Sequence, residues 1–311
     1  MKKLNLFLIL SFVLVISTIV FYVNRSPISR ISQRQYNNIQ YDNYTNSLWA
    51  SYIFEDKLYI ISKITSSDNF DFEQPKIVDT PEKEKILSFC IVENFVWVAI
   101  TDKPTTQTGA IYIYDKSNET LNKFLDFNVT DCKVIQDEVT VFWGENKVLI
   151  IDKNKQVREI EISGIVYDVA QDNEGSIWVA NEYGEIYKDE ENTTVLVLSE
   201  EPKTKMFFDA NNNLWIINEK FIFLDANSDL LNPQVLRSNL QDHLYSAFED
   251  NQNRVWLILR KNILRYENGE LIDIDTPPNA INFRFGGVDW NNQLAFVGSS
   301  RGIYEIDLTS K

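Results

Sequence analysis

Short apolar segments separated by polar turns run along most of the 311-residue chain, and they return at a regular interval. The pattern is clearest in segments 172–178, 209–215 and 250–256. Each segment begins with Asp, continues with four residues of a turn and ends with an aliphatic residue and a Trp. The three Trp residues are 37 and 41 residues apart. A period near forty residues, filled with short strands, predicts the blades of a β-propeller.

The same template extends to seven positions, each expected to lie in a strand and called here the slot of its blade. The slots hold Trp49, Trp97, Thr140, Trp178, Trp215, Trp256 and Ala295. About nine residues after each slot a second apolar segment follows, as at Gly184–Tyr187 and Gly302–Tyr304. The two landmarks predict seven β-hairpins. We therefore expect an all-β fold in which residues 41–311 form a seven-bladed β-propeller.

The residues that define the repeat are predicted to be structural. A blade cannot bury both of its faces alone, so the blades must stack around an axis. We expect each slot Trp to fill the gap between neighbouring sheets, with its indole N–H in need of a partner. The Asp and Asn residues before the slot are turn formers that bond to their own backbone. Because the chain has only 10 Gly, Asn and Asp are expected to take left-handed turn positions.

One blade carries a recognisable signature. Its residues are Asp172, Gly175, Trp178, Gly184, Ile186 and Tyr187. This string resembles the two-component regulator propeller repeat, which forms ligand-sensing propellers outside the membrane in some bacterial hybrid sensor kinases. The blades at Trp215 and Trp256 keep the Asp and the Trp and replace the Gly, so the strong resemblance covers residues 165–311. It implies a sensing or binding role on the extracytoplasmic side.

The N-terminus predicts one membrane-spanning or signal helix. Residues 4–23 are uncharged and follow two Lys, and twenty helical residues span about 30 Å, the thickness of a bilayer core. A secretory signal would have a shorter apolar region and a cleavage site with small residues, so residues 1–24 are interpreted as an uncleaved anchor. Residues 25–40 are a linker or a closing strand. We expect a single-pass protein of the cell membrane with an extracytoplasmic propeller; the alternative is a secreted or periplasmic protein after signal cleavage.

Charge excludes one class of partner. The formal charge is −15, whereas a nucleic-acid binder needs a basic face. No nucleic acid is therefore expected, and acidic charge fits simple solubility.

Two cysteines occupy nearly equivalent places on neighbouring blades. Cys90 and Cys132 precede their slots by seven and eight residues, so they could lie close together. An oxidising compartment would allow a disulfide, but two small buried hydrophobic residues are the favoured interpretation.

Candidate chemistry is sparse. A zinc cluster needs several His or Cys, and the only His is His243, interpreted as a solvated turn residue beside Asp242. Streptogramin lyases, propellers with a similar repeat, work with a catalytic His and a magnesium site, and nothing beyond His243 supports that activity here. Asp225, Asn227 and Asp229 alternate as in a calcium loop, but Leu occupies both the sixth and the twelfth position, so a turn is favoured. No catalytic, cofactor-binding or metal-ligating residue is predicted, and no cofactor.

Glycosylation triplets, relevant only in a glycosylating eukaryote, begin at Asn24, Asn43, Asn118, Asn128 and Asn192.

These observations favour a membrane-tethered, non-catalytic module that binds or senses a protein or a small ligand. No kinase, helix-turn-helix or second membrane span is recognisable, so any signal is expected to pass to a separate protein. One alternative is an extracytoplasmic lyase or hydrolase that uses carboxylates at the channel mouth. Carboxylates that converge in one pocket with perturbed pKa values would favour that enzyme. The other alternative is a scaffold subunit of a membrane complex.

Overall fold

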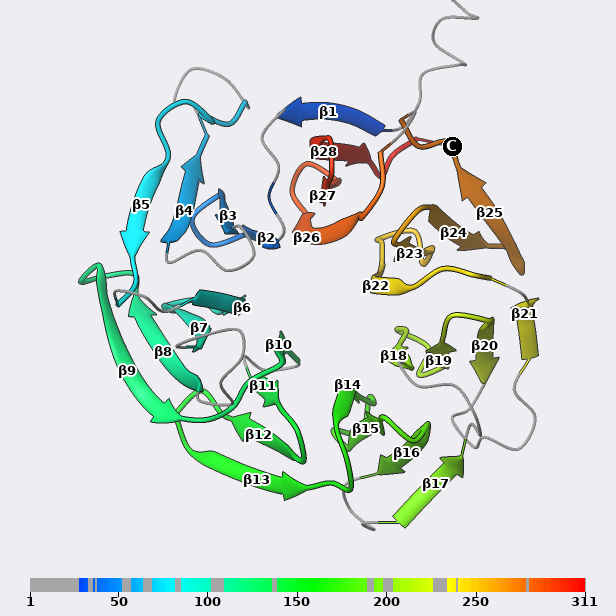
Figure 1. Cartoon of the computed structure of the whole chain (residues 1–311). Helices are drawn as coiled ribbons and strands as arrows, with labels where there is room; N and C mark the ends of the chain where they lie inside the picture. Colours follow the sequence, from blue (N-terminus) through cyan, green and yellow to red (C-terminus); the bar gives the residue numbers. More distant parts are fainter. Residues whose placement is uncertain are drawn as a thin grey trace, which may run out of the picture.

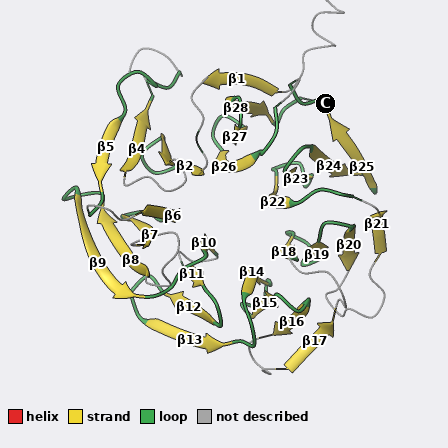
Figure 2. Ribbon diagram, in the orientation of Figure 1, coloured by secondary structure: helices red, strands yellow, loops and turns green. Residues whose placement is uncertain are grey.

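Seven four-stranded antiparallel sheets surround a central axis (Figures 1 and 2). The computed structural model describes residues 28–310 apart from 33–35, 37, 52–56, 64–68, 82–84, 102–108, 136–138, 189–192, 198–203, 226–233, 239 and 278–279. The described residues contain only strands and turns, so the predicted all-β, seven-bladed propeller is confirmed. No helix in this part of the chain is long and apolar enough to cross a membrane, and the predicted anchor at residues 4–23 lies outside it.

The strands of each blade follow one another outward from the axis (Figure 1). The innermost strands are β2 (Asn38–Asp42), β6 (Lys85–Ile91), β10 (Asp131–Val134), β14 (Val166–Gln171), β18 (Lys205–Phe208), β22 (Leu244–Glu249) and β26 (Arg284–Asp289). The second strands are β3 (Ser47–Ser51), β7 (Phe95–Thr101), β11 (Thr140–Trp143), β15 (Ile177–Asn181), β19 (Leu214–Ile217), β23 (Val255–Leu259) and β27 (Leu294–Ser299).

The third strands are β4 (Lys57–Ser62), β8 (Gly109–Asp115), β12 (Lys147–Ile151), β16 (Glu185–Lys188), β20 (Phe221–Asp225), β24 (Ile263–Glu267) and β28 (Gly302–Asp307). The outermost strands are β5 (Lys76–Asp79), β9 (Thr120–Asp126), β13 (Val157–Glu161), β17 (Thr193–Val197), β21 (Gln234–Ser238), β25 (Glu270–Ile274) and β1 (Ile28–Ser32). We number the blades 1 to 7 from β2. Blade 7 takes its outer strand from β1, which pairs with β28, so the two ends of the propeller close the ring together.

Hydrophobic cores fill the interfaces between adjacent blades. One cluster joins Trp49 of blade 1 to Val98 of blade 2, and another joins Trp256 of blade 6 to Val297 of blade 7. Both faces of the second strands are covered, and Ile177–Asn181 is buried along its whole length. This burial explains why these strands read as continuous apolar runs and not as alternating patterns.

The repeated Asp and Trp form one structural unit in blades 4, 5 and 6. In blade 4, Asp172 Oδ1 accepts the Ser176 N–H at 2.8 Å, and Asp172 Oδ2 accepts the Trp178 indole N–H at 2.9 Å. The equivalent indole bonds are 3.0 Å at Asp209 and 2.7 Å at Asp250. The carboxylate therefore closes the turn and pairs the buried indole, and we call this arrangement the Asp–Trp clamp.

Asparagine replaces glycine inside these turns, as expected. Gly175, Asn212 and Asn253 are each three residues after the clamp Asp, with φ of 91°, 62° and 57°. Asn tolerates this left-handed conformation better than most residues, so the chain can keep the turn without Gly.

Two of the seven predicted slots are wrong by one residue. Trp178 packs toward the next blade, but Ala295 lies in the cluster shared with the preceding blade 6, and Phe296 packs against blade 1. Thr140 has the same orientation, because Phe142, two residues on, packs against blade 2. Thr140 is the first paired residue of its strand, the place that Ile177 and not Trp178 takes in blade 4. Before Ala295 the connection from Asp289 to Leu294 is one residue shorter than the one from Gln171 to Ile177, and a shift of one residue turns every side chain to the other face.

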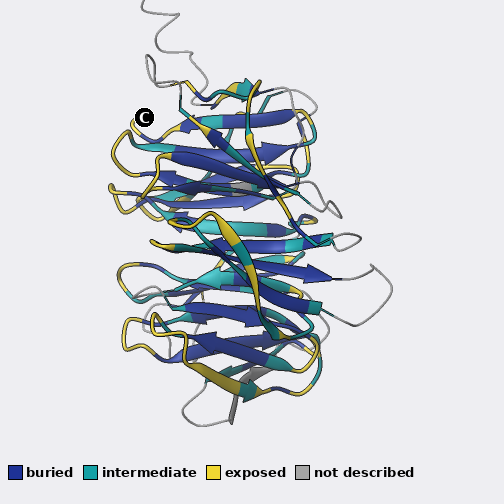
Figure 3. Cartoon of the chain, turned by 90° about the vertical axis from the view of Figure 1, so that its left-hand side faces the viewer, coloured by how far each residue is buried: buried dark blue, intermediate teal, exposed yellow. Residues whose placement is uncertain are grey.

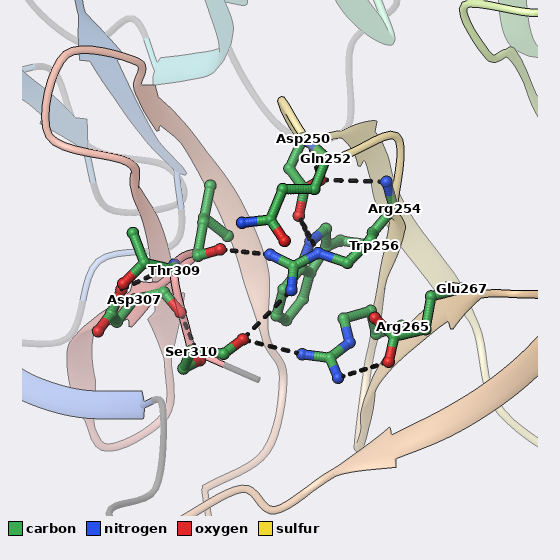
Figure 4. A network of polar contacts seen from close by, with 10 residues as sticks. Asp250, Gln252, Arg254, Trp256, Arg265, Glu267, Asp307, Thr309 and Ser310 are labelled. Atoms are coloured by element: carbon green, nitrogen blue, oxygen red, sulfur yellow. Dashed lines mark hydrogen bonds and ion pairs between the residues drawn. The ribbon is translucent and has the colours of Figure 1, made fainter.

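The end of the described chain is fastened to blade 6. Arg254 donates to the carbonyls of Leu308 and Ser310, and Arg265 donates to Ser310 and to Glu267 Oε1 at 2.9 Å (Figure 4). This contact lies on the face that carries the turns between first and second strands, which we call the turn face; the chain end marks it at the left in Figure 3. The opposite face, where the innermost strands begin, is called the start face.

Candidate functional site

A central cavity of about 620 Å³ is lined by residues of all seven innermost strands. Innermost strands are sheet edges, so their outer row of N–H and C=O groups has no partner strand. A buried backbone group without a hydrogen bond is costly, so these groups need other partners. Side chains of neighbouring blades supply many of them, and these side chains are also the polar groups that line the cavity.

Blade 1 bonds to the edge of blade 2 through two amide side chains. Asn38 Nδ2 donates to the Leu87 carbonyl at 3.0 Å, and Gln40 Nε2 donates to the Phe89 carbonyl. The Ile91 N–H donates to Gln40 Oε1 at 3.2 Å. Gln40 thus acts as a substitute strand, accepting and donating along the edge of β6.

Charged side chains perform the same task between blades 3, 4 and 5. Asp168 Oδ2 accepts the Met206 N–H at 2.7 Å, and Lys205 Nζ donates to the Tyr167 carbonyl at 2.9 Å. Lys205 Nζ is also 3.6 Å from Asp168 Oδ1. Lys133 Nζ, from blade 3, donates to the Val169 carbonyl at 3.2 Å. The carboxylate of Asp168 is therefore occupied by internal donors.

The second carboxylate of the lining lies beside a disulfide. Asp131 Oδ1 accepts the Ser88 hydroxyl at 2.6 Å and the Cys132 N–H at 2.9 Å. Cys132 is bonded to Cys90, with 6.2 Å between their Cα atoms. The favoured sequence interpretation, two unlinked buried cysteines, is therefore wrong. The two residues lie on the innermost strands of adjacent blades, which places their Cα atoms within the range of about 4.4–6.8 Å that a disulfide requires.

Arg284 is the least engaged charged group of the lining. Its guanidinium carbon lies 4.6 Å from the centre of the Tyr245 ring, a cation–π contact. Tyr245 is the extra residue of a β-bulge in β22, and β26 has a bulge between Phe285 and Gly287. Bulges re-aim side chains and are frequent near binding and active sites.

The charge of the lining differs from that of the chain. Lys133, Lys205 and Arg284 line the cavity with Asp131 and Asp168, whereas the whole chain carries a formal charge of −15. With three cationic and two anionic side chains, the lining carries a small positive formal charge. This arrangement suits an anionic group better than a cation or a metal.

The two carboxyl groups with raised pKa values lie outside the cavity lining. Burial raises the pKa of Glu249, and the nearby Asp209 and Asp250 add to it despite a hydrogen bond from the Ala210 N–H. Burial and the nearby Asp307 raise the pKa of Glu305. Glu249 and Glu305 therefore do not supply a pair of convergent carboxylates in this cavity.

The remaining sequence candidates are structural in the described region. His243 Nδ1 lies 3.0 Å from Glu219 Oε1, and Asp242 Oδ2 accepts the Lys261 N–H at 3.0 Å, so both residues brace loops of the start face. Asp225 is buried at the end of β20, while Asn227 and Asp229 lie outside the described residues. No group of three or more His, Cys, Asp or Glu that could hold a metal occurs in the described part of the chain.

Sequence reasoning missed the cavity residues. Asp131 and Lys205 precede their predicted slots by nine and ten residues, where polar or charged residues interrupt otherwise apolar strands. That recurring polar position was the available signal. This signal was missed because the repeat motif lies in the turn and the second strand of each blade, whereas the cavity is lined mainly by the first strands.

The geometry defines a seven-bladed propeller with a polar, cation-rich central cavity. A scan of protein families finds no matching model, and a search of curated proteins finds no significant match. Solved propellers are similar in structure. YCF48 bound to D1 peptide matches with a TM-score of 0.65 at 13% identity, over 91% of this chain and 95% of that chain. The WD40 propeller domain of Doa1 matches with a TM-score of 0.67 at 14% identity, over 90% of this chain and 96% of that chain.

A propeller from a two-component system, the class that the repeat resembles, is also similar in structure. The extracellular domain of the putative hybrid two-component system BT4673 from B. thetaiotaomicron matches with a TM-score of 0.64 at 11% identity. The match covers 91% of this chain and 40% of that one. The predicted resemblance to two-component regulator propellers is therefore confirmed at the level of the fold. At 11% identity, structural similarity shows the fold alone.

Proposed function

We propose that this protein is an extracytoplasmic binding or sensing module, tethered to the membrane through residues 4–23, and that it performs no chemistry. The observation that carries the proposal is the central cavity. Its two carboxylates, Asp131 and Asp168, each accept a hydrogen bond from a neighbouring blade, so both have a structural role in the cavity wall. A cavity of about 620 Å³ with a few fixed polar groups is typical of ligand sites.

Similar propellers support a binding role. One similar structure is described as bound to a peptide, and another as the extracellular domain of a putative two-component system. Taken with the apolar segment at residues 4–23, these likenesses favour a propeller outside the cytoplasm that recognises a protein or a small ligand.

Site-specific photo-crosslinking in intact membranes tests the proposal. Tyr183 is 56% exposed in a turn of the start face, and Ile77 is 48% exposed on the outer strand β5. A photoreactive amino acid at position 183 should capture a defined partner, whereas the same group at position 77 should not. Equal, diffuse labelling from both positions would contradict the capture of a defined protein partner by the propeller. A mature protein that begins after Val23 and fractionates as soluble would remove the tether from the proposal.

A further inference from the structure

Arg284 has donors that the protein does not use. The side chain is half-buried in the cavity and contacts the Tyr245 ring, but it makes no hydrogen bond or ion pair among the described residues. Other arginines that are buried or half-buried have acceptors. Arg254 Nε donates to Asp250 at 2.7 Å, and Arg237 forms two hydrogen bonds with Asp273, at 3.2 and 3.0 Å. Arg284 is therefore positioned without an acceptor.

The surrounding backbone fixes where Arg284 stands. Gly286 and Gly287 let β26 pack closely on β2: a Cβ at Gly286 would overlap Ile39, and one at Gly287 would lie 2.8 Å from the Tyr41 nitrogen. Gly287 also has φ of 118°, which disfavours any other residue. The start of β26 is thus held tightly at the cavity wall, and the aromatic ring of Tyr245 orients the guanidinium plane.

The chemistry of the cavity then selects a ligand class. A guanidinium presents paired N–H groups that match the two oxygens of a carboxylate. Lys205 and Lys133, on other innermost strands, add positive charge, and Tyr245 and Phe207 supply apolar surface for the rest of a ligand. The cavity volume suits a small molecule or the end of a short chain.

We propose that the central cavity binds a small ligand through a carboxylate, which Arg284 holds in a two-hydrogen-bond pair. The inference rests on the proposed binding function and names the ligand class for it. A carboxylate of this kind could be the C-terminus of a short peptide or the acid group of a uronic sugar, and the experiment separates the two.

Calorimetric titration of the full-length protein in mild detergent tests this assignment with two matched pairs of probes. The first pair is Ala-Ala-Ala with a free C-terminus and its C-terminal amide. The second pair is trigalacturonic acid and its methyl ester. We expect one of the acids to bind, and its neutral partner to bind at least about tenfold more weakly, because the charge-assisted pair is lost. The acid that binds identifies the source of the carboxylate.

Two variants locate the interaction. Arg284→Gln should weaken binding of the acid by about tenfold or more. Arg284→Lys should give an intermediate loss, because lysine keeps the positive charge but lacks the paired N–H donors of the guanidinium. Arg301→Gln changes an exposed arginine of the same blade and should leave affinity unchanged. Thermal unfolding of each variant verifies that it is folded.

Three results would overturn the assignment: neutral probes that bind as tightly as the acids, unchanged affinity in Arg284→Gln, or no binding of either acid at millimolar concentration. A partner captured from position 183 together with any of these results would leave the proposed binding function standing and remove only the carboxylate site.

Discussion

Blades 4–6 and blades 1 and 7 place the same kind of carboxylate before the second strand but pair it differently. In blades 4–6 the second oxygen accepts the indole of the same blade, six residues on. In blade 7, Asp289 accepts Lys63 Nζ at 3.0 Å and the Tyr41 hydroxyl at 2.9 Å, both from blade 1. In blade 1, Asp42 lies 2.7 Å from Lys116 Nζ of blade 2.

The length of the turn explains the difference. In blades 1 and 7 the aromatic residues that face the next blade, Trp49 and Phe296, are seven residues after the Asp and not six. The clamp is absent there: Trp49 Nε1 is buried without a hydrogen-bond partner, and Phe296 has no N–H to offer. Each buried carboxylate instead takes a cation from the neighbouring blade.

The repeat signature therefore marks one of two ways in which a blade pairs its buried carboxylate. A buried carboxylate oxygen needs a donor, which can come from its own blade or from the next one. The cross-blade solution links blade 7 to 1 and 1 to 2, and the Cys90–Cys132 disulfide then links 2 to 3. The part of the ring where the sequence motif fades, blades 7, 1, 2 and 3, is therefore the part joined by these carboxylate pairs and the disulfide, and we call it the cross-blade half.

Breaking the disulfide should have the largest effect on this comparison. The bond closes a loop with a sequence separation of 42 residues. Replacing both cysteines, Cys90→Ala with Cys132→Ala, should lower the free energy of unfolding by about 2–4 kcal/mol. Denaturant unfolding of the wild type and the double variant, with and without reducing agent, measures it.

The reducing agent provides the internal control. It should destabilise the wild type by a similar amount and leave the double variant unchanged. If wild type and variant were equally stable under oxidising conditions, the bond would contribute nothing to the stability of the cross-blade half, which would then rest on its ion pairs and hydrophobic cores.

The same comparison shows how far the sequence could lead. The fold and the number of blades could be predicted from the period of about forty residues. That period is recognisable because Asp and Trp are six residues apart in each of blades 4, 5 and 6. The slots at Thr140 and Ala295 are displaced by one residue because the apolar pattern alone does not set the strand register: Thr140 takes the place of Ile177, and the connection before Ala295 is one residue shorter than in blade 4. Arg284 could not be predicted, since its role depends on strands of different blades meeting around one cavity.

Removing the charge of a clamp should have the next largest effect. Asp172→Asn leaves a carbonyl for the turn but turns an amide toward the Trp178 indole N–H, and two donors cannot pair. We expect a loss of about 1–3 kcal/mol at neutral pH, measured by denaturant unfolding. Asp152→Asn is the matched control, because Asp152 accepts the Asn154 and Gln156 N–H groups in a similar turn and no indole, and it should change stability little.

The effect of Asp172→Asn should also depend on pH. Burial alone would raise the pKa of Asp172, but the hydrogen bonds from Trp178 and Ser176, with Lys188 nearby, outweigh it and lower the pKa below its usual range. The charged clamp therefore stabilises the fold fully above the unfolded pKa of about 3.9, and this contribution is lost as pH falls through the folded value. The difference between wild type and variant should shrink in acid; a constant difference from pH 7 to pH 3 would contradict the assignment.

A smaller effect separates the two kinds of buried Trp. Trp215 donates its indole N–H to Asp209, whereas Trp49 has no partner for the same atom. Replacement by Phe removes similar volume at both sites, so the difference between the variants isolates the hydrogen bond. Trp215→Phe should cost about 1–2 kcal/mol more than Trp49→Phe in denaturant unfolding. Equal costs would mean that the clamp holds the turn and adds nothing through the indole.

The smallest effect should be a gain in stability at Thr140. This side chain is fully buried in blade 3, and its hydroxyl has no hydrogen-bond partner. Thr140→Val keeps the shape and removes the unpaired polar atom, so the free energy of unfolding should rise by about 0.5–1 kcal/mol. Thr45→Val is the control, because the Thr45 hydroxyl donates to Asp42 Oδ2 at 2.8 Å, and losing that bond should destabilise the cross-blade half. A gain at position 140 with a loss at position 45 would show that the Thr140 hydroxyl is an uncompensated buried polar group, whereas the Thr45 hydroxyl stabilises the fold through the Asp42 carboxylate.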